Sequence, residues 1–183
     1  MHHLIWKRDA HPEAPFTEAS FVEPGRLRGL KFTQAAPLPE PFPDVQIALD
    51  GPVTDYFMVG TMHVVSERLA QVITAAVPAK HIALYPVQVT SEGTLADGGH
   101  QCLHLLHAVD GLDWERSRYT PLKDWADRLE QIVLVHKRVR IHKLFRLARC
   151  TTPVICVRED LASEIKAADV TGVRFVTPEE WRR

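Results

Sequence analysis

The spacing of apolar residues along the chain predicts two helices. After Ser66, apolar side chains recur at the three- and four-residue intervals of an amphipathic helix. Ser66 suits the start of this helix because a serine hydroxyl accepts hydrogen bonds from unpaired backbone N–H groups, and Pro78 ends it. Apolar residues at helical spacing over about 160–168 predict the second helix.

Short runs of apolar and β-branched residues predict the strands. These runs lie at 82–89, 101–109, 131–135, 154–157 and 173–176. The segment 91–99, which closes in Asp97-Gly98-Gly99, has the sequence of a turn, and Thr177-Pro178 begins a capped helical turn. Because strands and helices do not alternate regularly, we predict an α+β fold with a mixed or antiparallel sheet and two to four helices packed on it.

The first 52 residues differ from the rest of the chain in their proline content. Eight of the 13 prolines lie there, and four of them alternate within residues 37–43. Alternating proline fixes φ and removes backbone donors, so this piece should be extended and lie outside any central strand. We therefore predict an irregular proline-rich arm over residues 1–52, with room for one short strand, packed on an α+β domain over residues 53–183.

Composition and charge narrow the class of protein. The chain has 183 residues, of which 45% are apolar and 25% charged, as in ordinary globular proteins. A net charge of -1 argues against a protein built to coat nucleic acid or an anionic membrane. No apolar run approaches the roughly 18 residues of a membrane span, and the three cysteines form neither a disulfide framework nor a zinc pair. A reducing cytoplasm is the expected compartment.

His100, His104 and His107 are the sharpest candidates for metal binding. On a helix their imidazoles would share one face and could hold a catalytic zinc ion, whereas on a strand His107 would face the opposite side. The preceding Gly-Gly turn favours a strand, so we assign no metal, cofactor or catalytic residue. A metal-dependent hydrolase using these histidines remains one alternative. Cys150, with two arginines nearby, is a weak candidate for a reactive thiol.

A basic segment over residues 136–149 is the strongest candidate for a binding surface. It contains six Lys or Arg residues and no acid. With a period of two, one face carries the candidate partner-binding residues His136, Arg138, Arg140 and His142. This face could contact an acidic protein, phosphates or only water, so a nucleic-acid binder is a second alternative, although the near-neutral net charge disfavours it.

The opposite face of the basic segment is apolar. We expect Val139, Ile141 and Phe145 to point inward, because burying each large apolar side chain stabilises the fold by roughly 1.5–3 kcal/mol. Read as a helix, the same residues also form an apolar stripe. The sequence therefore leaves open whether 136–149 is a strand or a helix.

Several motifs in the C-terminal half resemble a known family in order and spacing. They are Val109-Asp-Gly-Leu-Asp113-Trp-Glu-Arg-Ser117, the apolar run 132–135, Leu144-Phe145-Arg146-Leu147, the strand 154–157 with Asp160-Leu161, and Val170-Thr-Gly-Val-Arg-Phe175. Together they resemble the eleventh class of bacterial polymorphic-toxin immunity proteins, over about residues 54–181. One departure is His136, which follows the apolar run where the family has an acidic residue.

The resemblance implies a function in interbacterial competition. Such a protein is cytoplasmic and non-catalytic, and it binds and neutralises a cognate toxin or effector domain encoded beside it. The identity of the toxin and the oligomeric state stay open at this point. We expect structural roles for the motif residues Asp113, Ser117, Phe145, Arg146 and Gly172. Asp113 or Ser117 should cap a helix or turn, and Arg146 should pair with a carboxylate at the surface.

Overall fold

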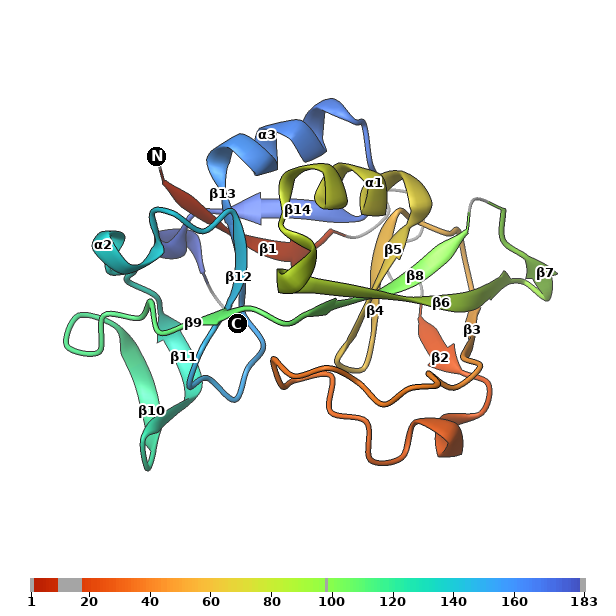
Figure 1. Ribbon diagram of the computed structural model, residues 1–183, viewed down its shortest axis with the longest axis horizontal. Helices are drawn as coiled ribbons and strands as arrows, with labels where there is room; N and C mark the ends of the chain where they lie inside the picture. The colour runs from red at the N-terminus through yellow and green to blue at the C-terminus, as the bar shows by residue number, and fades with distance from the viewer. Residues whose placement is uncertain (1, 10–17, 98, 182–183) are drawn as a thin grey trace.

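Two β-sheets form the frame of the molecule, shown in Figure 1 as a computed structural model that describes residues 2–9, 18–97 and 99–181. The larger sheet has seven strands. Six lie in the order β2 (Ala19–Phe21), β3 (Gln46–Leu49), β6 (Ile82–Ser91), β8 (His100–Leu105), β5 (Met62–Ser66) and β4 (Tyr56–Val59), and β7 (Thr94–Leu95) pairs with β6. The β3–β6 pair is parallel and the others are antiparallel.

The smaller sheet has five strands. Their order is β14 (Val173–Val176), β1 (His3–Arg8), β13 (Ile155–Arg158), β12 (Leu144–Leu147) and β9 (Ala108–Val109). The β12–β9 pair is parallel and the others are antiparallel. A separate hairpin of β10 (Arg118–Leu122) and β11 (Trp125–Gln131) extends at one end of the molecule (Figure 1).

Helices α1 (Glu67–Ala76) and α3 (Glu159–Ala167) lie side by side and cover a core shared by both sheets (Figure 1). Ser66 caps α1, since its Oγ accepts a hydrogen bond from the backbone N–H of Leu69 at 3.2 Å. The apolar face of each helix is buried, with Ile73 on α1 and Ile165 on α3 fully enclosed. The remaining helical pieces are α2 (His136–Val139), η1 (Pro24–Leu27), η2 (Ala79–His81) and η3 (Pro178–Glu180).

The predicted α+β class is confirmed, with mixed sheets and helices packed on them. Both predicted helices, the strands β6, β13 and β14, and the capped turn at η3 lie where the patterns placed them. The predicted strand 101–109 is interrupted, because β8 ends at Leu105 and β9 begins at Ala108. Gly98, part of the predicted turn at 91–99, lies outside the described residues.

Two predictions about strands are wrong. The described part of residues 1–52 contains three strands rather than one. Strand β1 lies inside the five-stranded sheet, where the side chains of Ile5 and Trp6 are buried. The irregular arm is therefore not confirmed, although residues 37–43 contain neither strand nor helix; residues 10–17 of that arm lie outside the described part. The apolar run 131–135 is not a strand, since β11 ends at Gln131 and a single bridge joins Leu134 to Leu112.

Candidate functional site

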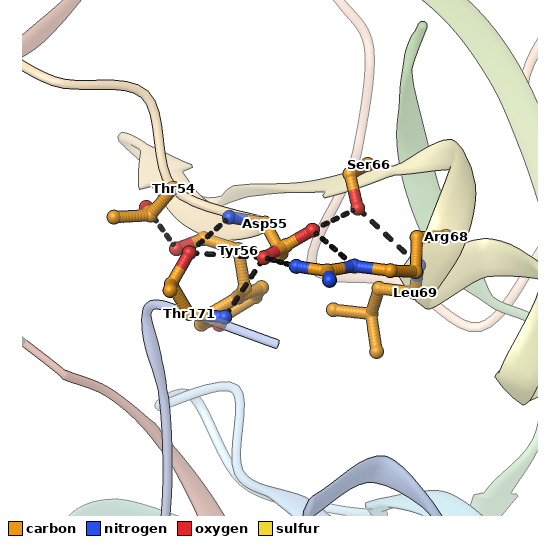
Figure 2. Close-up of polar contacts among 7 residues, drawn as sticks. All are labelled: Thr54, Asp55, Tyr56, Ser66, Arg68, Leu69 and Thr171. Atoms are coloured by element: carbon orange, nitrogen blue, oxygen red, sulfur yellow. Dashed lines mark hydrogen bonds and ion pairs between the residues drawn. The ribbon is translucent and has the colours of Figure 1, made fainter. Parts of the chain in front are cut away.

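Asp55, which directly precedes β4, is the most highly connected polar side chain described (Figure 2). Its Oδ1 accepts hydrogen bonds from Ser66 Oγ at 2.7 Å and from Arg68 Nε at 3.3 Å. Its Oδ2 accepts from Arg68 Nη2 at 2.7 Å, from the backbone N–H of Thr171 at 2.8 Å and from Thr171 Oγ1 at 2.9 Å. One carboxylate thus ties the start of α1 to the loop before β14.

The electrostatics of Asp55 indicate a structural role. Partial burial would raise its pKa, but the hydrogen bonds from Arg68, Ser66 and Thr171 outweigh that effect and lower the pKa to about 2. Five donors reach a carboxylate that offers about four acceptor positions. A cavity of about 270 Å³ opens beside Asp55 and is also lined by His100. Because the oxygens of Asp55 are occupied, we assign it to holding the fold together rather than to acid–base chemistry in that cavity.

Gly172 lies in the same loop before β14 and packs against β4. Its φ is +81°, and an added Cβ would lie 2.1 Å from the carbonyl oxygen of Tyr56 and 2.8 Å from Thr54 Oγ1. Any other side chain would therefore displace the backbone of β4. The Thr171-Gly172 step of the C-terminal motif is explained by this contact with β4. Periodicity could not identify Asp55, because Thr171 lies 116 residues away in sequence.

The basic segment 136–149 is part helix and part strand, in the form of α2 followed by β12. His136, Arg138 and Arg140 are exposed, and Val139 and Phe145 are buried. His142 is only half-exposed.

The inward position expected for Ile141 is wrong, because its side chain is 69% exposed. The chain turns after α2 instead of continuing with a period of two, and this turn places Ile141 on the outside. The exposed cationic face therefore has an apolar residue beside it.

Arg138 connects this face to a neighbouring loop. Its Nη1 donates to the carbonyl oxygen of Asp110 at 3.3 Å and lies 4.0 Å from Asp110 Oδ2. Arg149 Nη1 lies 3.6 Å from the same oxygen. Exposed pairs of this kind contribute only about 0–1 kcal/mol to stability, so these guanidinium groups can be rearranged at low cost by a partner.

The three histidines considered as candidates for metal binding, His100, His104 and His107, do not converge. His104 Nε2 lies 2.7 Å from the carbonyl oxygen of Ala36, whereas the His100 ring packs 6.0 Å from Phe57 and His107 faces a different set of residues. His107 lies beyond the end of β8 at Leu105, and His100 and His104 are separated by four residues along the strand, a distance of about 13 Å. Within the described residues, no group of three or more His, Cys, Asp or Glu side chains is arranged to hold a metal ion.

A different histidine cluster joins the two sheets. His107 stacks on His81 with ring centroids 4.0 Å apart, and its Nε2 lies 2.9 Å from Nδ1 of His142. The carbonyl oxygen of His142 accepts a hydrogen bond from His3 Nε2 at 2.8 Å. Burial, with smaller contributions from His81 and His142, lowers the pKa of His107 to about 4. The His107 ring is therefore neutral near pH 7.

The motif residues Asp113 and Ser117 hold one turn. Asp113 Oδ1 accepts hydrogen bonds from the backbone N–H groups of Glu115 at 3.2 Å and Arg116 at 3.1 Å. Ser117 Oγ accepts from the backbone N–H of Val133 at 3.0 Å, which fixes the turn to the segment after β11.

The surface ion pair expected for Arg146 is wrong. Its side chain is buried, and its guanidinium donates to the carbonyl oxygens of Phe32 and Thr33. The segment at Phe32 and Thr33 covers this side chain, and its backbone oxygens take the place of the expected carboxylate. Cys150 is also buried; burial raises the pKa of its thiol to about 11, which argues against a reactive thiolate.

The chain matches the model of the Immunity protein family (Imm11) over residues 9–180. The match includes most of the first 52 residues, which the sequence motifs alone did not cover. No curated protein matches the chain significantly. Among the described residues, no helix is long and apolar enough to cross a membrane.

Proposed function

The chain belongs to the Immunity protein family (Imm11), and we propose that it binds and neutralises a cognate bacterial toxin domain in the cytoplasm without catalysing a reaction. The partner is a protein encoded beside it and active in interbacterial competition. Neutralisation by binding requires a surface that recognises the toxin, rather than a metal centre or nucleophile.

The observation that supports a binding surface is the exposed cationic face at α2. His136, Arg138 and Arg140 project from one short stretch of chain, with Ile141 exposed next to them. Arginine guanidinium groups bind carboxylates through two parallel hydrogen bonds. A toxin that uses this face should therefore present carboxylates there, and long-range attraction should accelerate the encounter.

The first experiment is co-purification with the protein encoded by the adjacent gene, together with rescue of growth when the two are co-expressed. We expect a tight one-to-one complex. Absence of binding between the two folded, soluble proteins would refute the proposed function.

The second experiment reverses charge on the face. The double variant Arg138→Glu/Arg140→Glu should slow association with the toxin and flatten its dependence on salt, while leaving thermal unfolding unchanged. The matched control is Arg28→Glu/Lys31→Glu, which changes two exposed cations in the segment around η1, away from α2 (Figure 1). If both double variants associate with the toxin at the same rate at low salt, the α2 face is not the binding surface.

A further inference from the structure

The tip of the β10–β11 hairpin exposes two large apolar side chains. Leu122 is 50% exposed and Trp125 is 48% exposed. They are direct cross-strand partners on either side of the Lys123-Asp124 turn, so they form one continuous apolar patch. The hairpin is a two-stranded sheet of its own, and in Figure 1 it extends at the same end of the molecule as α2.

The exposure of this pair does not result from a loosely attached hairpin. Strand β11 is anchored along its length by buried Ala126, next to the tip, and Leu129. The backbone N–H of Ala126 donates to the carbonyl oxygen of Arg149 at 2.8 Å, and Trp181 Nε1 donates to that of Leu129 at 3.1 Å. At the tip, Arg149 Nε donates to the carbonyl oxygen of Asp124 at 2.8 Å. A tip held this firmly loses little conformational entropy when a partner binds it.

A chain of contacts connects the tip to the cationic face. Arg149, which holds the turn through Asp124, also lies over the ring of Trp114 at 4.6 Å and pairs with Asp110. Asp110 in turn pairs with Arg138 of α2. The hairpin tip is thus linked through Arg149 and Asp110 to the face proposed to bind the toxin, and its surroundings carry the cations Lys123 and Arg149.

We propose that Leu122 and Trp125 insert into an apolar pocket of the toxin domain, and that carboxylates around this pocket meet Lys123 and Arg149. This inference rests on the proposed function, to which it adds the anchoring residues. Tryptophan combined with arginine at the margin is the composition typical of residues that dominate binding energy in protein interfaces. Exposed apolar side chains gathered on a rigid element are typical of an interaction site.

The test measures the affinity and kinetics of the complex with the toxin domain of the adjacent gene's product. Trp125→Ala and Leu122→Ala should each weaken binding, with the tryptophan change costing about 30-fold in Kd, mainly through faster dissociation. The matched control is Leu95→Ala, which removes a 64% exposed leucine from β7 of the seven-stranded sheet. This change should alter Kd by less than about twofold.

Several outcomes would overturn the inference. If Trp125→Ala and Leu122→Ala retain the wild-type Kd while their melting temperatures are unchanged, the tip is not an anchor. If Trp125→Ala unfolds, the milder variants Trp125→Phe and Leu122→Ala are measured instead. Wild-type Kd for both folded variants would then overturn the inference. If the substitutions abolish a dimer of this chain but leave toxin binding intact, the occupant is a second copy and the inference is wrong. Failure of the wild-type protein to bind the toxin would refute the proposed function itself.

Discussion

Replacing Gly172 by alanine should be among the most destabilising single-methyl changes in this protein. Gly172 has a φ of +81°, and its added Cβ would lie 2.1 Å from the carbonyl oxygen of Tyr56. Gly29 offers a matched control, because its φ is +89° but nothing lies within 4 Å of its added Cβ. The two substitutions share the backbone cost and differ in the steric contact.

The backbone cost of an alanine in the left-handed region is about 1 kcal/mol at either position. At Gly172, relief of the contact must also separate the loop from β4. That movement threatens the hydrogen bonds from Asp9 N to Gly172 O at 2.8 Å and from Tyr56 N to Thr171 O at 3.1 Å, as well as those from Thr171 to Asp55. With three of these four bonds lost at about 1 kcal/mol each, added to the backbone cost, Gly172→Ala should cost about 4 kcal/mol in total.

Thermal unfolding of the purified variants measures this difference. For a domain of this length, 1 kcal/mol corresponds to about 2–4 °C in melting temperature. We expect a decrease of about 12 °C for Gly172→Ala and about 3 °C for Gly29→Ala. Equal decreases for the two variants would refute the argument that the close approach to Tyr56 makes glycine necessary at residue 172.

Three further predictions concern the internal polar contacts. The free energy of unfolding should be highest above about pH 6.5 and decline toward pH 4, because the pKa of His107 is near 6.5 in the unfolded chain and about 4 in the folded chain. In urea titrations at several pH values, His107→Gln should make that decline shallower. An unchanged decline would contradict the lowered pKa of His107. Asp113→Ala should lower the free energy of unfolding by about 0.5–2 kcal/mol because two backbone N–H groups lose their acceptor, and retained stability with lost toxin binding would instead place Asp113 in the interface. Arg146→Met should cost about 1–3 kcal/mol because it removes a buried guanidinium and leaves the carbonyl oxygens of Phe32 and Thr33 without this donor. Arg140→Met, at an exposed position, should cost less than about 0.5 kcal/mol. Equal denaturation midpoints would show that the hydrogen bonds of Arg146 are not stabilising.

The features that sequence predicted well are those set by neighbouring residues. Helix α1 follows from an apolar stripe and the cap at Ser66, and η3 follows from Thr177 before proline. In η3 the Thr177 side chain accepts from the backbone of Glu180 while the Glu180 side chain accepts from the backbone of Thr177. Each of these interactions spans three residues or fewer, so the local pattern contains the information needed.

The features that sequence missed depend on distant partners. Asp55 is fixed by Thr171, and Arg146 by the carbonyl oxygens at Phe32 and Thr33, more than 110 residues away in both cases. A basic residue in an apolar strand suggests an exposed ion pair unless the chain segment that covers it is known. Ile141 was misplaced because periodicity assumes one regular element, whereas the chain changes from helix to strand around it.

The residues that carry the family resemblance and the residues that could recognise a partner are largely different sets. Asp113 accepts hydrogen bonds within one turn, Ser117 fixes that turn to Val133, Gly172 packs against β4, and the buried side chain of Arg146 binds backbone oxygens. Polar groups already paired inside the fold have little capacity left for a toxin. Exposed substitutions on α2 and at the hairpin tip should change stability by about 0.5 kcal/mol or less, so partner preference can vary there while the framework remains intact.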